Sequence, residues 1–309
     1  MRIVVTGAAG FIGWHLVDTL TRRGDVVQAW IRRPGSADWE GAVETAAVDM
    51  TDRNAISRQL AAFAPDVIVH LAAQSLPGRS WEEPALTYEV NVVGVIHLLE
   101  AVRRLTHLPR VMVAGSSAEY AEPPNDQPIS EQAPTEPNSP YGGSKLAADQ
   151  LAQLYVRRYD LDLVRFRPFF LAGPRKVGDV CSDFARRIVA IERGQDSTMR
   201  VGPLDVVRDL IDVRDGISGL LRIIESGRRG EVYNICGGRG VAIRKILEGY
   251  RRLAAAPFSV RQDLALMRAL EQRVRIGDAT KLRGLGWQPE YTLDDTLRSI
   301  LDYWRALPQ

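Results

Sequence analysis

Short runs rich in valine and isoleucine alternate with longer stretches of helical period through the first half of the chain. The runs are continuously apolar, which is typical of parallel strands that helices cover on both faces. Strand and helix alternating at this spacing predict an α/β fold with a doubly wound parallel sheet. The predicted strands are residues 2–7, 25–31, 44–48, 66–73, 110–117 and 161–168, and the predicted helices are residues 13–24, 55–64, 91–105 and 145–159.

The pattern changes after Pro168. A helix is predicted at residues 182–194, and residues 231–238, EVYNICGG, form a short strand that we expect to return to the sheet. The rest is mostly helical and is expected to cap the carboxyl ends of the strands, where ligands of such sheets bind. We therefore divide the chain into a dinucleotide-binding domain, residues 1–166 completed by parts of 206–238, and a smaller, mostly helical substrate lobe, residues 167–205 and 239–309.

Composition and charge limit the kinds of partner and site that we expect. The 309 residues are 45% hydrophobic and 25% charged, and the net charge of +2 is too small to favour a nucleic-acid surface. Cys181 and Cys236 lack CxxC spacing and the four histidines lack ligand spacing, so neither a disulfide framework nor a metal site is expected. Neither a charged leader nor an apolar run near 18 residues stands out, which predicts a cytoplasmic protein without a membrane partner.

The first predicted turn is rich in glycine. The sequence TGAAGFIG places Gly7, Gly10 and Gly13 between the first strand and the first helix. Small residues there let the backbone approach a pyrophosphate, and the start of the helix offers unpaired N–H groups. In that context the turn predicts a dinucleotide site, although a structural tight turn would use the same residues.

The end of the second strand distinguishes the two nicotinamide dinucleotides. Ile31 stands where an acidic residue would meet the ribose hydroxyls of NAD, and Arg32 and Arg33 follow it. The arginines favour NADP(H), with NAD(H) as the alternative. Asp49 follows the third strand and is a candidate for the adenine amino group, or else the start of the next helix.

Residues 140–145, PYGGSK, place Tyr141 and Lys145 four positions apart at the start of a helical stretch. This is the ordinary spacing of helical neighbours, and most such pairs in unrelated proteins only pack on a helix surface. Their meaning depends on the other motifs of the chain.

Those motifs occur in a characteristic order. After the glycine turn come HLAA at 70–73, NVVG at 91–94, AGSS at 114–117 and YGGSK at 141–145. In this order the chain resembles the extended short-chain dehydrogenase/reductases that act on nucleotide sugars, and the resemblance covers nearly its whole length. It implies a Rossmann fold and an enzyme that commonly forms homodimers through helices matching residues 92–105 and 147–159.

The resemblance implies a catalytic set of Tyr141, Lys145 and a hydroxyl from Ser116 or Ser117, with Asn91 ordering the site. We prefer Ser117, because the hydroxyl of the family precedes a short acidic stretch, which here ends in Glu119. A ketone that accepts hydride needs a proton donor at its oxygen. A free tyrosine has a pKa of about 10, and we expect the Lys145 cation to lower it.

The resemblance also implies the remaining contacts. The cofactor-binding residues would be Gly7, Gly10, Phe11, Ile12, Gly13, Arg32, Arg33, Asp49, Met50, Leu71, Ala72, Ala73, Asn91, Tyr141, Lys145 and Pro168. The substrate-binding residues would be Ser116, Glu119, Arg208, Arg268 and Glu271, with Arg268 and Glu271 at the GDP end and Arg208 near the pyrophosphate or ribose. Arg175 and Lys176 depart from the family pattern, and we expect them to bind the substrate by compensating for the charge of a diphosphate.

Within this family the C-terminal part resembles bacterial GDP-6-deoxy-4-keto-D-mannose reductases, which make GDP-D-rhamnose, and the related GDP-mannose 4,6-dehydratases. A dehydratase needs a further acid/base group; Glu119 is a candidate, but Ala118 beside it is not. We therefore expect the NADP-dependent reductase. The alternative is the GDP-mannose 4,6-dehydratase or another nucleotide-sugar epimerase or dehydratase of the family, and a catalytically silent NAD(P)-binding scaffold is a third interpretation. Phe170 and Leu171 replace the usual Asn-His, which leaves the sugar and base open.

Overall fold

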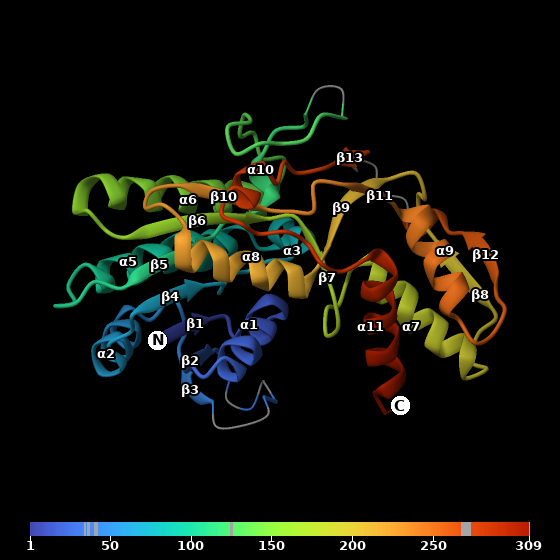
Figure 1. Cartoon of the computed structure of the whole chain (residues 1–309), viewed down its shortest axis with the longest axis horizontal. Coiled ribbons are helices and arrows are strands. Elements are labelled where there is room, and N and C mark those ends of the chain that lie inside the picture. Colours follow the sequence, from blue (N-terminus) through green and yellow to red (C-terminus); the bar gives the residue numbers. More distant parts are fainter. Residues whose placement is uncertain (34, 36–37, 40–42, 124–125, 267–272, 309) are drawn as a thin grey trace.

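The computed structural model describes residues 1–33, 35, 38–39, 43–123, 126–266 and 273–308. Its larger domain is built on a seven-stranded parallel sheet (Figure 1). The strands are β1 (Arg2–Thr6), β2 (Val26–Ile31), β3 (Glu44–Ala47), β4 (Val67–His70), β5 (Arg110–Ala114), β6 (Leu163–Pro168) and β10 (Val232–Ile235). Their order is β10-β6-β5-β4-β1-β2-β3. Successive strands are added outward in one direction from β1 to β3 and in the other direction from β4 onward, so the strand order reverses between β1 and β4. Ligands of such sheets bind at that point.

Each central strand is buried on both faces, as the continuous apolar runs predicted. In β1, Ile3 and Val5 enter one hydrophobic cluster, and Val4 enters the other. Helices α1 (Phe11–Arg22) and α8 (Val213–Ser226) contribute to the first cluster. The second cluster is covered by α2 (Arg53–Phe63), α5 (Gly94–Val102) and α6 (Pro140–Tyr159).

Strand β10 confirms that the chain returns to the sheet after residue 230, because it pairs in parallel with β6. One helical stretch was not expected. Helix α3 (Pro77–Glu82) precedes α4 (Pro84–Tyr88), which continues through a π-helix (Glu89–Val93) into α5.

The described stretch Pro84–Val102 has a mean hydropathy of 1.4 and is long and apolar enough to cross a membrane. The sequence expectation of no apolar run near that length is therefore wrong. The stretch is nevertheless part of the fold, since Leu98, Leu99 and Val102 are fully buried in the second hydrophobic cluster. Helix α5 packs against α2 and α6, which is the arrangement of a core helix.

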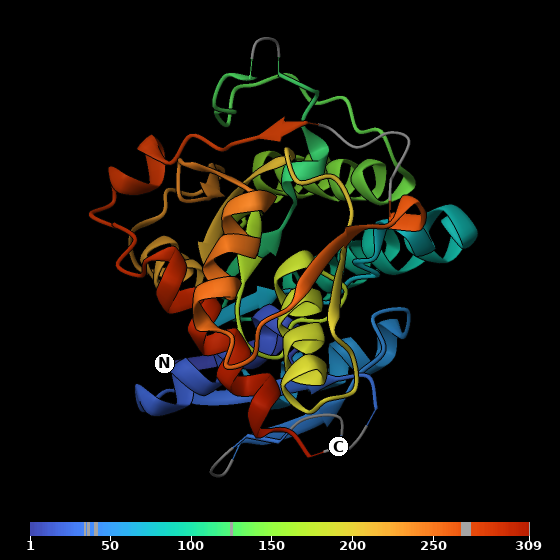
Figure 2. The ribbon, with the colours of Figure 1, turned by 90° about the vertical axis from the view of Figure 1, so that its right-hand side faces the viewer.

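The substrate lobe lies beyond the carboxyl ends of the strands, on the right of Figure 1, and Figure 2 views it from its own side. Its helices are α7 (Val180–Glu192), α9 (Ile243–Leu253) and α11 (Leu293–Ala306), whereas α10 (Thr280–Arg283) packs against β10 of the main sheet. It also contains two small sheets that the sequence did not predict. One is formed by β7 (Phe170–Ala172), β9 (Val207–Asp212), β11 (Gly240–Ala242) and β13 (Val274–Arg275), and the other by β8 (Thr198–Val201) and β12 (Ser259–Gln262).

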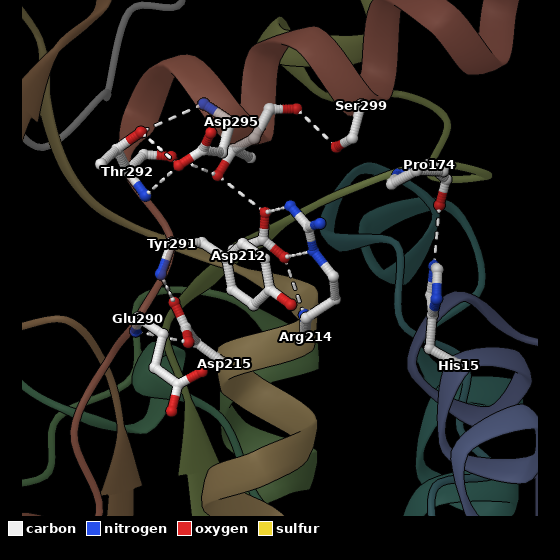
Figure 3. Close-up of polar contacts among 11 residues, drawn as sticks. His15, Pro174, Asp212, Arg214, Asp215, Glu290, Tyr291, Thr292, Asp295 and Ser299 are labelled. Atoms are coloured by element: carbon white, nitrogen blue, oxygen red, sulfur yellow. Dashed lines mark hydrogen bonds and ion pairs between the residues drawn. The ribbon is translucent and has the colours of Figure 1, made fainter. Parts of the chain in front are cut away.

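Two buried aspartates join the lobe to the sheet domain (Figure 3). Asp212 caps α8 by accepting from the Arg214 backbone N–H at 2.8 Å, and it accepts from the Thr296 hydroxyl of α11 at 2.8 Å. Asp215, one turn into α8, accepts from the Tyr291 backbone N–H at 3.2 Å. Because α8 covers the main sheet, these contacts fix α11 and the lobe relative to the strand ends.

Candidate active site

The glycine turn has the close packing that a phosphate site requires. Gly7 has a φ of +63°, and a Cβ added there would lie 2.6 Å from the Ala72 nitrogen. A Cβ on Gly13 would lie 2.4 Å from the Gly7 carbonyl oxygen. Gly10 precedes α1 without a side-chain cap, so the first N–H groups of the helix face outward from the turn. These residues fit a dinucleotide pyrophosphate, and Phe11 and Ile12 follow at the start of α1.

The chain after β4 lies directly beside this turn. The Thr6 hydroxyl accepts from the backbone N–H groups of Leu71 and Ala72 at 3.2 and 3.0 Å. It also contacts the buried His70 ring at 2.8 Å. Burial lowers the pKa of His70 to about 3, so the ring is neutral. The segment from Leu71 to Ala73 is thereby held where the resemblance implied cofactor contacts.

The far end of the predicted dinucleotide site carries the two arginines. Arg32 and Arg33 follow β2 and are exposed. Asp49 is also exposed; hydrogen bonds from the Thr51 N–H and hydroxyl, at 2.9 and 2.8 Å, hold its pKa below the usual range, and Arg32 acts in the same direction. Arg32 and Asp49 therefore face one region. The Met50 side chain is buried in the core and its carbonyl contacts the His97 ring at 3.1 Å, so the described contacts of Met50 are with the protein.

The side chain of Ser116 lies close enough to the Tyr141 hydroxyl to act on its pKa, which it lowers. Ser116 caps the 3-10 helix Ser117–Glu119, and its hydroxyl accepts from the Ala118 N–H at 3.1 Å. Ser117 instead lines a neighbouring cavity, and its carbonyl accepts from Arg275. The contacts therefore favour Ser116, and not the Ser117 preferred from the sequence, as the partner of Tyr141. The two neighbours differ because the backbone turns between them.

Lys145 is 6% exposed and lies one turn along α6 from Tyr141. Its ammonium donates to the Ala114 carbonyl at the end of β5, at 2.8 Å. Burial lowers the pKa of Lys145 to about 8, while the charge of Glu119 acts to raise it. Burial raises the pKa of Tyr141, and the Ser116 side chain acts to lower it. Burial dominates and the Lys145 ammonium points to the strand end, so these contacts give no support to the expectation that Lys145 lowers the pKa of Tyr141, which stays a prediction.

Asn91 joins two parts of the site. It is buried in the π-helix, a rare element that often marks functional positions. Its side chain accepts from the Gln74 N–H at 2.8 Å and donates to the Ser144 hydroxyl at 2.9 Å. Ser144 in turn donates to the Tyr141 carbonyl at 2.7 Å. Asn91 thus links the loop after β4 to the helix that carries Tyr141 and Lys145.

Glu119 lies beneath the site and not in it. Its side chain is 0% exposed, accepts from the Ser116 N–H at 2.7 Å and lies 2.7 Å from the Arg167 guanidinium. Burial raises the pKa of Glu119 to about 7, and Arg167 acts to lower it. These contacts point the carboxyl group inward, which argues against the roles of catalytic base and substrate ligand expected from the sequence.

Glu119 belongs to a set of buried charges that sequence reasoning missed. Arg167 of β6 also contacts Asp149 of α6 at 2.9 Å, and Arg165 contacts the same carboxylate at 3.0 Å. We call Glu119, Arg167, Asp149 and Arg165 the buried charge network. Breaking one partner of such a set leaves an uncompensated buried charge, so its members hold one another in place. The network holds Ser116 in place through Glu119, which accepts from the Ser116 N–H.

The expected substrate residues lie in separate places. Arg208 lines a cavity of about 140 Å³ together with Ser117, Phe169, Phe170, Asp209 and Arg275. Pro168 is half-buried at the end of β6, next to this cavity wall. Arg268 and Glu271 lie outside the described residues. The cavity therefore contains one of the cations expected from the sequence and a further one, Arg275, that was not expected.

Arg175 faces the dinucleotide side, whereas Lys176 lies between Phe11 of α1 and Phe170 of the cavity wall. Arg175 pairs with Asp38 at 2.6 Å and lies over the Trp14 ring of α1 at 4.3 Å. Lys176 donates to the Leu171 carbonyl at 2.5 Å and lies over the Phe170 ring at 4.3 Å. Arg175 is thus engaged at the surface of the sheet domain, away from the cavity of Arg208, and its expected role at the substrate diphosphate is not supported by these contacts.

The arrangement is suited to moving a proton at an oxygen atom beside Ser116. Tyr141 can donate the proton, and the Ser116 hydroxyl can bind the same oxygen and fix its position. Lys145 keeps a positive charge near the ends of β4 and β5, close to the glycine turn. A bound nicotinamide dinucleotide supplies or accepts the hydride. The site therefore has the parts of a dehydrogenase or reductase acting on a carbonyl or alcohol.

Comparison with known proteins agrees with this class. The family model of GDP-mannose 4,6 dehydratase matches residues 4–300, so the chain belongs to that family of extended short-chain dehydrogenase/reductases. It is 31% identical over 309 residues to the GDP-6-deoxy-D-mannose reductase of Pseudomonas aeruginosa, covering 99% of this chain and 97% of that protein.

Solved structures give the same result. RMD from Pseudomonas aeruginosa, complexed with NADPH, matches with a TM-score of 0.87 and 30% identity, over 99% of both chains. The UDP-glucose 4-epimerase of Thermus thermophilus, complexed with NAD, matches with a TM-score of 0.88 and 29% identity, also over 99% of both chains. The chain is accordingly a nucleotide-sugar enzyme of this family that uses a nicotinamide cofactor.

Proposed function

We propose that the protein reduces the C4 ketone of GDP-4-keto-6-deoxy-D-mannose to GDP-D-rhamnose, with hydride from NADPH and a proton from Tyr141. This reaction needs a proton donor, a hydroxyl that binds the ketone oxygen and a nearby cation. Tyr141, Ser116 and Lys145 meet that need. The similarity to the reductase of Pseudomonas aeruginosa supports the same substrate.

The inward position of Glu119 is the observation that favours reduction over dehydration. A 4,6-dehydratase must remove a proton from C5 and lose the C6 hydroxyl, which requires an acid/base group beyond Tyr141. Glu119 was the candidate, but it is fully buried and held by Ser116 and Arg167. Ala118, which follows the two serines, has no group to donate or accept a proton. A reductase needs no acid/base group at either of these two positions.

The preference for NADPH rests on the exposed Arg32 and Arg33 at the end of β2. A guanidinium binds a phosphate through paired charge-assisted hydrogen bonds, and the ribose 2′-phosphate is what distinguishes NADP from NAD. The relative solved with NADPH supports the same preference. A guanine base is proposed from the reductase relative alone.

The test is a set of three reactions with purified protein. GDP-4-keto-6-deoxy-D-mannose with NADPH should give oxidised cofactor and GDP-D-rhamnose in equal amounts. GDP-mannose without added reductant would give a 4-keto product if the protein were a dehydratase, and UDP-glucose would be interconverted with UDP-galactose if it were an epimerase. Turnover only in either of the last two reactions would overturn the proposal. Cofactor binding with no turnover in any reaction would support a silent nucleotide-binding protein.

We also propose a cytoplasmic homodimer. The outer surfaces of the π-helix and α6 expose Val93 and Leu154, which are 38% and 58% exposed. Apolar side chains on two neighbouring helices favour a helix-packed contact between two copies. Leu154→Glu should then convert a dimer into a monomer in sedimentation analysis, and a wild-type monomer would exclude it. Cell fractionation tests the location.

A further inference from the structure

Tyr120 ends the short turn that begins at Ser116, and we call residues 116–120 the catalytic turn. The Tyr120 backbone N–H donates to the Ser117 carbonyl at 3.2 Å, which closes the 3-10 helix. Its buried hydroxyl donates to the side-chain oxygen of Asn234 at 2.7 Å. Burial raises the pKa of Tyr120, so the hydroxyl keeps its proton and stays the donor. The end of the catalytic turn is therefore tied to a buried amide on another strand of the sheet.

Asn234 lies on β10, where the register places it beside Arg167 of β6. Partner residues on neighbouring parallel strands point to the same side of a sheet. Tyr120 accordingly contacts both: the Arg167 guanidinium lies over its ring at 4.7 Å, and Asn234 accepts from its hydroxyl. Arg167 is also the ion-pair partner of Glu119, which accepts from the Ser116 N–H. Both ends of the catalytic turn thus depend on two neighbouring side chains of the sheet.

The Asn234 amide also reaches the segment that forms the cavity wall. Its nitrogen donates to the Ile129 carbonyl at 2.9 Å. Ile129 is buried in the long loop before α6, where its N–H donates to the Ile276 carbonyl at 2.8 Å and its carbonyl accepts from the Asp278 N–H at 2.9 Å. Arg275, directly before this segment, lines the cavity of about 140 Å³. Asn234 is therefore a junction between the catalytic turn and the cavity wall.

The junction requires both sides of the amide. The Asn234 oxygen faces the Tyr120 hydroxyl, and its nitrogen faces the Ile129 carbonyl. Of the side chains of similar size, aspartate has no donor when ionised and leucine has neither a donor nor an acceptor. The position matters for chemistry, because a misplacement of a reacting group by about 1 Å can lower a rate about 10²-fold.

We propose that Tyr120 and Asn234 are positioning residues, which hold Ser116 at the substrate oxygen and couple the catalytic turn to the cavity wall. Both side chains are buried, so they act through the turn and not by contact with the substrate. Their loss should therefore lower kcat far more than it changes the KM of either substrate. The inference rests on the proposed function only in taking Ser116 as the hydroxyl that binds the substrate oxygen.

The test is a double-mutant cycle with the purified full chain. Tyr120→Phe keeps the ring over Arg167 and removes the hydroxyl, so kcat should fall about 10-fold with little change in KM. In the Ser116→Ala background the same change should have no further effect on kcat, because the group that it positions is absent. Tyr250→Phe is the matched control and should keep the wild-type kcat, since Tyr250 is fully buried in the hydrophobic cluster of the substrate lobe.

Asn234→Leu tests the junction. Leucine has a similar shape and removes both hydrogen bonds, so kcat should fall at least as far as in Tyr120→Phe, and the two changes together should lower it no further than Asn234→Leu alone. Hydrogen exchange of residues 116–120, measured by mass spectrometry, should be faster in both variants than in the wild type and Tyr250→Phe. Thermal unfolding checks that each variant is folded, and if Asn234→Leu does not fold, the cycle with Ser116→Ala decides.

Two results would overturn the proposal. One is a wild-type kcat in Tyr120→Phe, and the other is an equal loss in kcat with and without the Ser116 hydroxyl, which would mean that Tyr120 only stabilises the fold. A wild type that forms a 4-keto product or interconverts epimers would refute the reductase alone, and the cycle is then measured on that reaction. If the wild type turns over no substrate, hydrogen exchange decides, and equal exchange of the catalytic turn in Tyr120→Phe and the wild type would overturn the proposal.

Discussion

The catalytic residues and the cavity wall of the substrate lobe are built in different ways. Ser116, Tyr141 and Lys145 are carried by the end of β5 and by the long helix α6, and the buried charge network holds them from below. Arg208 and Arg275 stand on short strands, one of which has two residues, and both are half-buried. The catalytic residues are thus held by buried contacts, whereas the cavity wall depends on short strands and is joined to the catalytic turn by the hydrogen bond from Arg275 to the Ser117 carbonyl.

The largest effect should come from removing the proton donor. Tyr141→Phe keeps the ring but has no hydroxyl, so turnover should fall about 10²- to 10⁴-fold. Binding of NADPH, measured by its fluorescence, should be close to that of the wild type, because the glycine turn is unchanged. Appreciable turnover in this variant would mean that Tyr141 is not the proton donor.

A smaller loss should distinguish the two serines. Ser116→Ala removes the hydroxyl that contacts Tyr141, and loss of one donor at a developing oxyanion lowers kcat about 10²- to 10³-fold. Ser117→Ala should retain kcat, because the described role of Ser117 in the cavity involves its carbonyl. Steady-state kinetics of both variants give the answer. The opposite order would restore the sequence preference for Ser117.

The exposed arginines at the cofactor end should have a moderate effect. Arg32→Ala should lower the preference for NADPH over NADH about 10-fold through loss of a phosphate contact. The kcat with saturating NADPH should not change, since Arg32 is remote from Tyr141. Arg58→Ala, an exposed change on α2, is the control. An equal preference for NADPH over NADH in Arg32→Ala and the wild type would mean that Arg32 is a surface residue that does not contact the 2′-phosphate.

The smallest effect should be a change in pH dependence. The negative charge of Glu119 raises the pKa of both Lys145 and Tyr141, and both must be protonated for reduction. Glu119→Gln removes that charge, so both groups should lose their protons at lower pH. The alkaline limb of kcat against pH should move to lower pH, while the exposed change Glu136→Gln leaves it in place. A limb that moves to higher pH would contradict this role.

The main sheet and the cofactor turn could be predicted because their signals are local. Val67 to Val69 form a continuously buried run, and Gly7 has the positive φ that its place in a tight turn requires. The choice between Ser116 and Ser117 could not be made, because it depends on where the backbone turns. Strand β13 has two residues, and only its partner β9 gives it a register.

The buried charge network also needed tertiary structure, since Glu119 and Asp149 are distant from β6 in sequence. One signal was present. Arg165 and Arg167 are two positions apart in a strand of a sheet covered on both faces, so they had to be buried together and needed carboxylate partners. Arg175 was misplaced because a charge next to a Gly-Pro turn does not reveal which domain it faces.

Transfer of a labelled hydride tests the central claim most directly. Purified protein is incubated with GDP-4-keto-6-deoxy-D-mannose and NADPH that carries deuterium at the transferable position of the nicotinamide, and the product is examined by NMR. We expect GDP-D-rhamnose with one deuterium at C4 and none elsewhere on the sugar. Unchanged ketone, or a product with deuterium at C6, would contradict it.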